Sequence, residues 1–292
     1  MPLTDLVRNL NARSRPPGGG QHSTTPFTVS GNQVFVHYAN LRLESRFVPY
    51  IETASGRFLG HAAQLRTIGL ANGRELEPAA VFALPADAEE FIYLDRLVRT
   101  LHALNYLTHP NPGNLLLKVN PRHVASIPAD HGLAFEEILR PCGLLPSQIT
   151  LEIEAGSPED AEHLKRAVTN YKSRGYGIAI SRFGNGGIDF GVLEEIRPGI
   201  VKLDAALLAS GRSLHRLAYG LHELGILVMA EGNDTSTLLR GAIAYVDLLQ
   251  LVEPQRRLLH ATAPAGRNPG ISTVAAASIS LLERNRSPSL RA

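Results

Sequence analysis

The sequence contains a single cysteine, Cys142, so the chain cannot form a disulfide within itself. A lone thiol suits a reducing compartment, because disulfides form and persist mainly where conditions are oxidising. The amino terminus lacks the apolar core of a signal peptide, and no run of about 18 apolar residues is present. We therefore expect a cytoplasmic protein with no membrane span.

Lysine and net charge are also low. Four of the 29 basic residues are lysine, and the formal net charge is +2. A balance this close to zero gives no indication of nucleic-acid binding. The chain of 292 residues is 44% hydrophobic, which is enough to bury a large core.

Two tails flank the body of the chain. Residues 1–30 contain RSRPPGGGQHSTTP, and this composition predicts a flexible N-terminal segment. Residues 263–292 also have the composition of a tail, although ISTVAAASISLLER within them could form a short docked helix. The residues between the tails, 31–262, form the predicted folded domain.

Apolar runs typical of strands divide this domain. They lie at residues 47–51, 58–66, 115–120, 149–154, 177–183, 200–204, 226–231 and 246–252. Helical patterns separate most of these runs, and such alternation favours a largely parallel sheet. The eight runs predict an α/β fold, a TIM-like (β/α)8 barrel. Because only ETASGR joins the first two runs, we expect an antiparallel first strand.

Polar residues follow the apolar part of six consecutive runs. In a barrel the carboxyl ends of the strands converge on one mouth, where enzymes of this fold place their chemistry. The spacing alternates so that side chains from several strands would point inward. This pattern predicts a functional site formed by Lys118, Asn120, Glu152, Glu154, Ser181, Arg182, Lys202, Asp204, Glu231 and Gln250.

Several short motifs resemble one known family in their order and spacing. They read FVPYIETASGRFLGHAAQLR, KVNPRHV, LEIE, SRFGNGG, VKLD, AEGNDT and LLQ, and they span about residues 35–255. Together they resemble the EAL domain, a family of phosphodiesterases specific for the bacterial second messenger cyclic di-GMP. The resemblance implies a barrel whose mouth binds this dinucleotide.

The resemblance also implies a site for one or two Mg²⁺ or Mn²⁺ ions, which would activate a water against the phosphodiester. Matching positions are Asn120 and Glu152 as metal ligands, Lys202 near the attacking water and followed by Asp204, Glu231 in Ala-Glu-Gly, Gln250 on the last strand, and Arg66 as a phosphate contact.

Other positions depart from the family. The Glu-Ala-Leu signature reads Ala62-Ala63-Gln64, and the aspartate pair before Phe-Gly reads Ser181-Arg182. Three acidic positions are thereby lost, and one has become a cation, which reverses the sign of the local field. We therefore predict no metal cofactor and no hydrolysis, with Asn120, Glu152, Lys202 and Glu231 as vestiges of the catalytic site.

The sequence leaves three functions open. The first is a catalytically inactive receptor that binds cyclic di-GMP and acts through contacts with a protein partner. Its ligand-binding residues would be Arg66, Arg182, Lys202, Asp204, Gln250 and Gln64. The alternatives are an adaptor that binds a protein partner without nucleotide, and a weak or atypical phosphodiesterase. A homodimer is compatible with each, and the sequence does not name the partner.

Arg182 carries a further prediction. It stands where the family has an aspartate, while the acids Glu152 and Glu231 remain on other strands around the mouth. Unpaired carboxylates in a recessed site are costly, so we expect the Arg182 guanidinium to point inward and pair with one of them. The alternative is that Ser181 points inward and Arg182 lies on the rim, because neighbouring residues of a strand face opposite sides.

Overall fold

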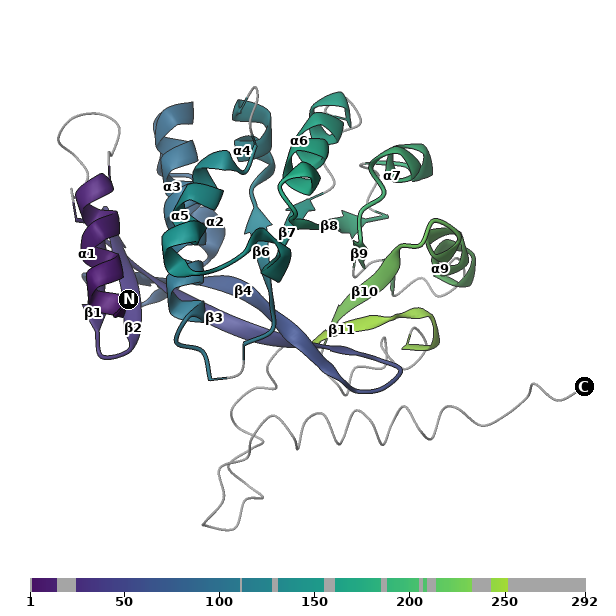
Figure 1. Cartoon of the computed structure of the whole chain (residues 1–292), viewed down its shortest axis with the longest axis horizontal. Helices are drawn as coiled ribbons and strands as arrows, with labels where there is room; N and C mark the ends of the chain where they lie inside the picture. Colours follow the sequence, from purple (N-terminus) through teal and green to yellow (C-terminus); the bar gives the residue numbers. More distant parts are fainter. Residues whose placement is uncertain are drawn as a thin grey trace, which may run out of the picture.

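The computed structural model describes residues 2–14, 25–110, 112–127, 131–154, 161–184, 188–204, 207–208, 214–232 and 243–251 (Figure 1). Its strands are β1 (Phe27–Ser30), β2 (Gln33–Tyr38), β3 (Leu41–Glu52), β4 (Phe58–Gly69), β5 (Glu75–Leu76), β6 (Asn114–Val119), β7 (Ile149–Glu154), β8 (Gly177–Phe183), β9 (Ile200–Leu203), β10 (Leu227–Gly232) and β11 (Leu248–Leu251).

Helices follow most of these strands. They are α1 (Leu3–Arg13), α2 (Pro78–Phe82), α3 (Ala88–Tyr106), α4 (Pro121–Ser126), α5 (Leu133–Cys142), α6 (Ala161–Ser173), α7 (Phe190–Ile196) and α9 (Leu214–Glu223), with short 3₁₀ turns η1 (Pro146–Gln148) and η3 (Ile243–Tyr245). None of the helices in the described part of the chain combines the length and apolarity that crossing a membrane would require.

Eight strands close into a barrel in the order β3, β11, β10, β9, β8, β7, β6 and β4, and pairing between β3 and β4 completes the circle. Strand β3 runs antiparallel to both of its barrel neighbours, and the other barrel pairings are parallel. The sequence-based prediction of a (β/α)8 barrel with an antiparallel first strand is confirmed.

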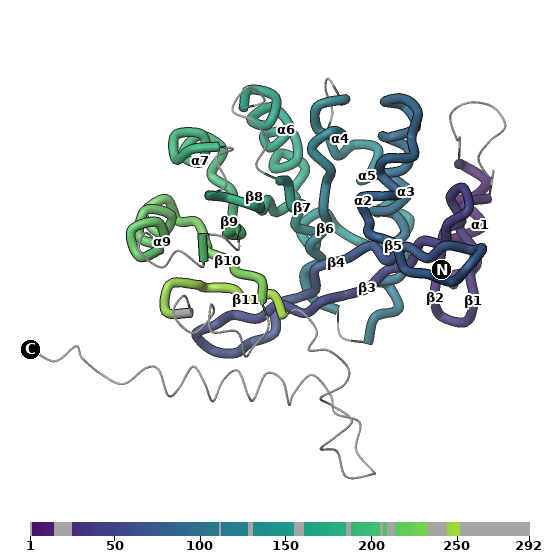
Figure 2. The backbone as a smooth tube through the Cα atoms, turned by 180° about the vertical axis from the view of Figure 1, so that it is seen from behind, coloured from purple at the N-terminus to yellow at the C-terminus, as the bar shows by residue number. Residues whose placement is uncertain are grey.

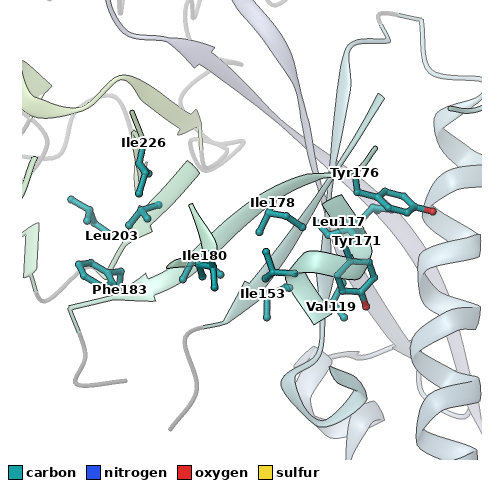
Figure 3. Close-up of a cluster of buried hydrophobic side chains, with 14 of the residues drawn as sticks. Leu117, Val119, Ile153, Tyr171, Tyr176, Ile178, Ile180, Phe183, Leu203 and Ile226 are labelled. Atoms are coloured by element: carbon teal, nitrogen blue, oxygen red, sulfur yellow. The ribbon is translucent and has the colours of Figure 1, made fainter. Parts of the chain in front are cut away.

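Alternation along the strands produces two apolar layers. Side chains on the outer faces pack against residues of the surrounding helices. Figures 1 and 2 show these helices in an arc outside the strands. Figure 3 shows part of this outer layer, with Ile153, Ile178 and Ile180 beside one another. A smaller inner cluster fills the barrel with Tyr50, Ala62, Leu116, Ala179, Met229 and Leu248. The next inward-facing residue toward the carboxyl end of each strand, two positions further on, is polar in several strands. These polar side chains therefore reach the mouth.

The N-terminal segment differs from the expectation of flexibility over residues 1–30, which is wrong for α1 and β1. Leu6, Val7 and Leu10 are buried, and they share one apolar cluster with β1, β2 and α3. Both views place α1 beside β1 and β2 at one end of the molecule (Figures 1 and 2). The apolar spacing of LTDLVRNLNAR is typical of an amphipathic helix, and the following glycine-rich stretch obscured it.

The predicted C-terminal tail, 263–292, and its candidate helix lie outside the described residues, as does the predicted boundary at residue 262. Residues 185–187, in the glycine-rich stretch after β8, also lie outside them.

Candidate functional site

A cavity of about 480 Å³ lies at the carboxyl end of the barrel strands and continues toward α2 and α3. Nine of the twelve predicted site residues line it, and Ser181, Arg182 and Asp204 do not. Its lining is Arg46, Ala62, Ala63, Gln64, Leu65, Arg66, Glu75, Glu77, Pro78, Phe82, Asp95, Val98, His102, Lys118, Val119, Asn120, Pro121, Glu152, Glu154, Lys202, Glu231 and Gln250. Residues of α2, α3 and β5 also contribute to the lining, and their contribution was not predicted from the sequence.

Lys202 lies at the centre of the charged floor of this cavity. Its Nζ is 2.7 Å from Glu231 Oε2 and 3.7 Å from Glu152 Oε1. It also donates a hydrogen bond of 3.0 Å to Gln250 Oε1. These residues come from β9, β10, β7 and β11, so the closed barrel brings together groups that are up to 98 residues apart (250 − 152).

The electrostatic balance on the floor favours a charged lysine. The Lys202 side chain is 10% exposed and that of Glu152 is 4% exposed. Burial alone would lower the pKa of Lys202, but Glu152 and Glu231 outweigh it, and the pKa of Lys202 is raised. The floor thus holds an ammonium group between two carboxylates.

Asn120, a metal ligand by family resemblance, acts locally as a helix cap. Its Oδ1 accepts a hydrogen bond of 3.0 Å from the Arg122 main-chain N–H at the start of α4. Its own main-chain N–H donates to Asp95 Oδ1 at 3.2 Å. Asp95 is buried beside Arg99, whose Nη2 lies 2.8 Å from Asp95 Oδ2. This buried ion pair fixes the strand-to-helix turn that carries Asn120.

The sequence already contained one signal for the buried pair. Asp95 and Arg99 are four residues apart in a helical pattern, a spacing that places their side chains on one helix face. Both residues are 2% exposed, so the pair faces the interior rather than solvent.

Arg66 lines the cavity wall above the floor. Its Nε donates to Glu75 Oε2 and its Nη1 to Glu44 Oε2, each at 3.0 Å. The side chain is 43% exposed. Gln64, two residues earlier on β4, lies opposite Arg46 of β3 and also lines the cavity. The Arg66 guanidinium is therefore exposed to the cavity, and a ligand that binds it would have to compete with two carboxylates.

Arg182 does not occupy the predicted position. The expectation that it pairs with Glu152 or Glu231 is wrong, because its Nη1 lies 2.7 Å from Glu154 Oε1 and its Nε 3.8 Å from Asp204 Oδ2. Ser181, which is 3% exposed, takes the inward position. The register of β8 shifts between Ile180 and Phe183, and Arg182 has a positive φ of 56°. Alternation in β8, with Ala179 inward and Ile180 outward, already places Ser181 inward and Arg182 on the rim, and the irregularity occurs at the same point.

The acidic side chains at the mouth are spread around the lysine. Among the described residues, no three His, Cys, Asp or Glu side chains lie together as they would need to for holding a metal ion. Ala62, which the sequence resemblance matches to the family's signature glutamate, is a buried member of the inner apolar cluster. The carboxylate oxygens of Glu152 and Glu231 face the floor of the cavity, and the Lys202 ammonium group lies between them.

Residues 33–250 match the EAL domain family. Because this match covers more than half of the chain, the protein belongs to that family. No curated protein sequence matches the chain. The fold is thus that of an EAL domain.

Solved structures show the same fold. BlrP1 of Klebsiella pneumoniae, in complex with calcium and cyclic di-GMP, is 21% identical with a TM-score of 0.59; the match covers 72% of this chain and 54% of BlrP1. YkuI of Bacillus subtilis, with cyclic di-GMP and calcium, is 16% identical with a TM-score of 0.64, over 84% of this chain and 61% of YkuI. This chain thus spans about half to three fifths of these proteins.

A standalone EAL protein from Vibrio cholerae O395, in its cyclic di-GMP-bound form, is also similar. Its identity is 21% and its TM-score 0.59, and the match covers 72% of this chain and 89% of that protein. At these identities the likeness establishes the barrel fold.

Proposed function

We propose that this EAL domain is a regulatory protein that binds its ligand without hydrolysing it. The observation that carries the proposal is the replacement of acidic family positions at the mouth, where the sequence has Ala62 and Ser181-Arg182. A hard divalent cation requires several oxygen ligands, and it must lower the pKa of a bound water to start hydrolysis. Here Glu152 and Glu231 remain around Lys202, and they are fewer oxygen ligands than such a cation requires.

The residues at the other family positions support this reading. The side chain of Ala62 has no oxygen that could bind a metal ion, and Ser181 has a hydroxyl where the family has a carboxylate. Asn120 Oδ1 is engaged by the α4 main chain. The residues present therefore do not fit the two-metal site that the family uses, and we propose that the mouth works without a metal.

The proposed ligand is cyclic di-GMP. The cavity volume of about 480 Å³ lies in the usual range of small-molecule sites, about 300–1,000 Å³. Arg66 presents a guanidinium at the cavity wall, and its planar fork suits a phosphate. Several solved EAL domains are complexes with this dinucleotide. The signal would pass to a protein partner from a cytoplasmic receptor.

A second candidate is an adaptor that binds a protein partner without nucleotide. One observation favours it: each cation assigned to phosphate binding is already paired with carboxylates. Lys202 contacts Glu152 and Glu231, and Arg66 contacts Glu44 and Glu75. Arg182 contacts Glu154 and points to the rim. A dianionic ligand would have to compete with these acids.

Two measurements on the full chain test the proposal. Incubation of cyclic di-GMP with Mg²⁺ or Mn²⁺ should give no hydrolysis above background; turnover near about 1 s⁻¹ would establish an atypical phosphodiesterase instead. Calorimetric titration in EDTA should give binding that Arg66→Ala weakens by about 1.5–3 kcal/mol, the range for a hydrogen bond to a charged group. Absence of binding both in EDTA and with Mg²⁺ would favour the adaptor.

A further inference from the structure

Beyond the barrel, β3 and β4 continue as a two-stranded ribbon, which forms one wall of the cavity. In the barrel, Tyr50 pairs with Gln250 of β11 and Ala62 with Leu116 of β6. Toward the mouth the two strands pair mainly with each other, and Glu44 lies directly opposite Arg66. Directly opposed residues on one face of an antiparallel pair have adjacent side chains.

The short strand β5 adds a second carboxylate to this face. Glu75 lies opposite Ile68, which is two residues beyond Arg66 on β4, so Glu75 is diagonal to Arg66. Diagonal neighbours are within reach of long side chains. Two strands on either side of β4 thus each direct one carboxylate toward the same guanidinium.

The contacts show how fully the guanidinium is engaged. Glu75 and Glu44 each accept a hydrogen bond of 3.0 Å, from Nε and Nη1 of Arg66 respectively. Mainly through its hydrogen bond to Glu75, the pKa of Arg66 is raised. Arg42 approaches Glu44 from the same strand, with Nη2 2.5 Å from Oε1. Glu44 therefore joins two arginines, and Glu75 holds Arg66 from the other side.

We propose that Glu44 and Glu75 form a carboxylate clamp that restrains Arg66 and thereby sets the affinity of the mouth for an anionic ligand. The inference rests on the proposed binding of cyclic di-GMP. A phosphate and a carboxylate seek the same N–H donors of a guanidinium, so the clamp competes with the ligand.

Exposure sets the size of the effect. The side chains of Arg66, Glu44 and Glu75 are 43%, 23% and 53% exposed. Ion pairs with this exposure contribute about 0.2–1 kcal/mol each, which corresponds to about 1.4- to 5-fold in an equilibrium constant. A ligand can therefore displace the two carboxylates from Arg66. Their competition is still strong enough to change the affinity of the cavity for the ligand measurably.

The binding experiment uses the full chain, cyclic di-GMP and EDTA. Glu44→Gln and Glu75→Gln should each raise affinity about threefold, and the double variant about tenfold. Glu77→Gln is the matched control, because Glu77 lines the same cavity and the described ion pairs of Arg66 are with Glu44 and Glu75. In an Arg66→Ala background the gains should disappear. A fall in affinity would mean that the acids orient Arg66 for the ligand, and would overturn the clamp.

A second readout needs no nucleotide. Arginine in an ion pair should react more slowly with phenylglyoxal than released arginine, and peptide mass spectrometry locates the modification. The double variant should increase modification of Arg66 at least twofold, and Glu77→Gln should not. If modification increases while no variant binds cyclic di-GMP, the clamp stands and the receptor proposal fails. Unchanged reactivity of Arg66 would overturn the clamp itself.

Discussion

Lys202 and Arg182 stand at the ends of neighbouring strands, β9 and β8, and each lies between two carboxylates. Their surroundings differ sharply. The Lys202 side chain is 10% exposed and points into the barrel, whereas the Arg182 side chain is 54% exposed on the rim. The buried cation also has a hydrogen bond to Gln250.

The difference follows from the backbone. Strand β9 is regular, so alternation directs Lys202 inward with Met229 of β10 as its paired neighbour. In β8 the same alternation turns Ser181 inward and Arg182 outward, and the register with β9 shifts at this point, where Arg182 has a positive φ. The two cations look equivalent in the sequence but have different energetic roles. Lys202 compensates the charge of a buried acid, whereas Arg182 forms an exposed ion pair on the rim.

Removal of Lys202 should have the largest effect on stability. Lys202→Met leaves Glu152, with a side chain 4% exposed, without its cation. Breaking a buried pair from one side typically costs about 3–5 kcal/mol, so we expect a loss of about 3 kcal/mol at pH 7. Urea unfolding followed by circular dichroism measures it.

A double variant separates the charge from the packing. Lys202→Met combined with Glu152→Gln should recover at least half of the loss, because no buried carboxylate remains without compensation at that position. A loss below about 1 kcal/mol for Lys202→Met alone would show that water enters the floor and screens Glu152.

The pattern of inward side chains was readable from the sequence, and the irregular positions were not. Period-two alternation predicts that Glu152, Lys202 and Gln250 reach the mouth, and all three line the cavity. Alternation also places Ser181 inward and Arg182 outward once Ala179 faces the barrel interior. It does not predict the shift of register between β8 and β9 that follows Ile180.

The ion-pair partners of Arg66 could not be predicted from the sequence either. Glu44 and Glu75 approach it from β3 and β5, at separations of 22 and 9 residues, and only the register of the ribbon brings them together. The helix α1 is a different case, because its apolar spacing was visible. The barrel itself was predictable because strand and helix periodicities recur along the chain.

His61 extends the comparison to a polar group buried without an ionic partner. It lies on the outer face of β4, 1% exposed, with its Nδ1 3.2 Å from the Tyr106 hydroxyl. Phe47, Phe58 and His109 also pack against its ring. Burial, with a smaller contribution from His109, lowers the pKa of His61 from 6.5 to about 4.

This lowered pKa predicts acid sensitivity. Between pH 6.5 and 4 the unfolded chain takes up a proton at His61 that the folded protein resists, so stability falls as pH falls. The limit is about 1.36 kcal/mol per pH unit. His61→Phe should reduce the loss between pH 6.5 and 4 by about 1–2 kcal/mol, measured by urea unfolding across that window. Parallel curves for the two proteins would contradict the assignment.

Substitution of Arg182 should have the smallest effect on stability. Two substitutions separate the contribution of its ion pair from the cost of its backbone conformation. The exposed pair with Glu154 contributes no more than about 0.5 kcal/mol, so Arg182→Ala should change stability by that amount or less. The φ of 56° is costly for any residue with a Cβ and costs glycine little. Arg182→Gly should therefore be about 1 kcal/mol more stable than Arg182→Ala in the same urea titration. If glycine is instead the less stable, the backbone at residue 182 is not strained, and the positive φ costs the side chain nothing measurable.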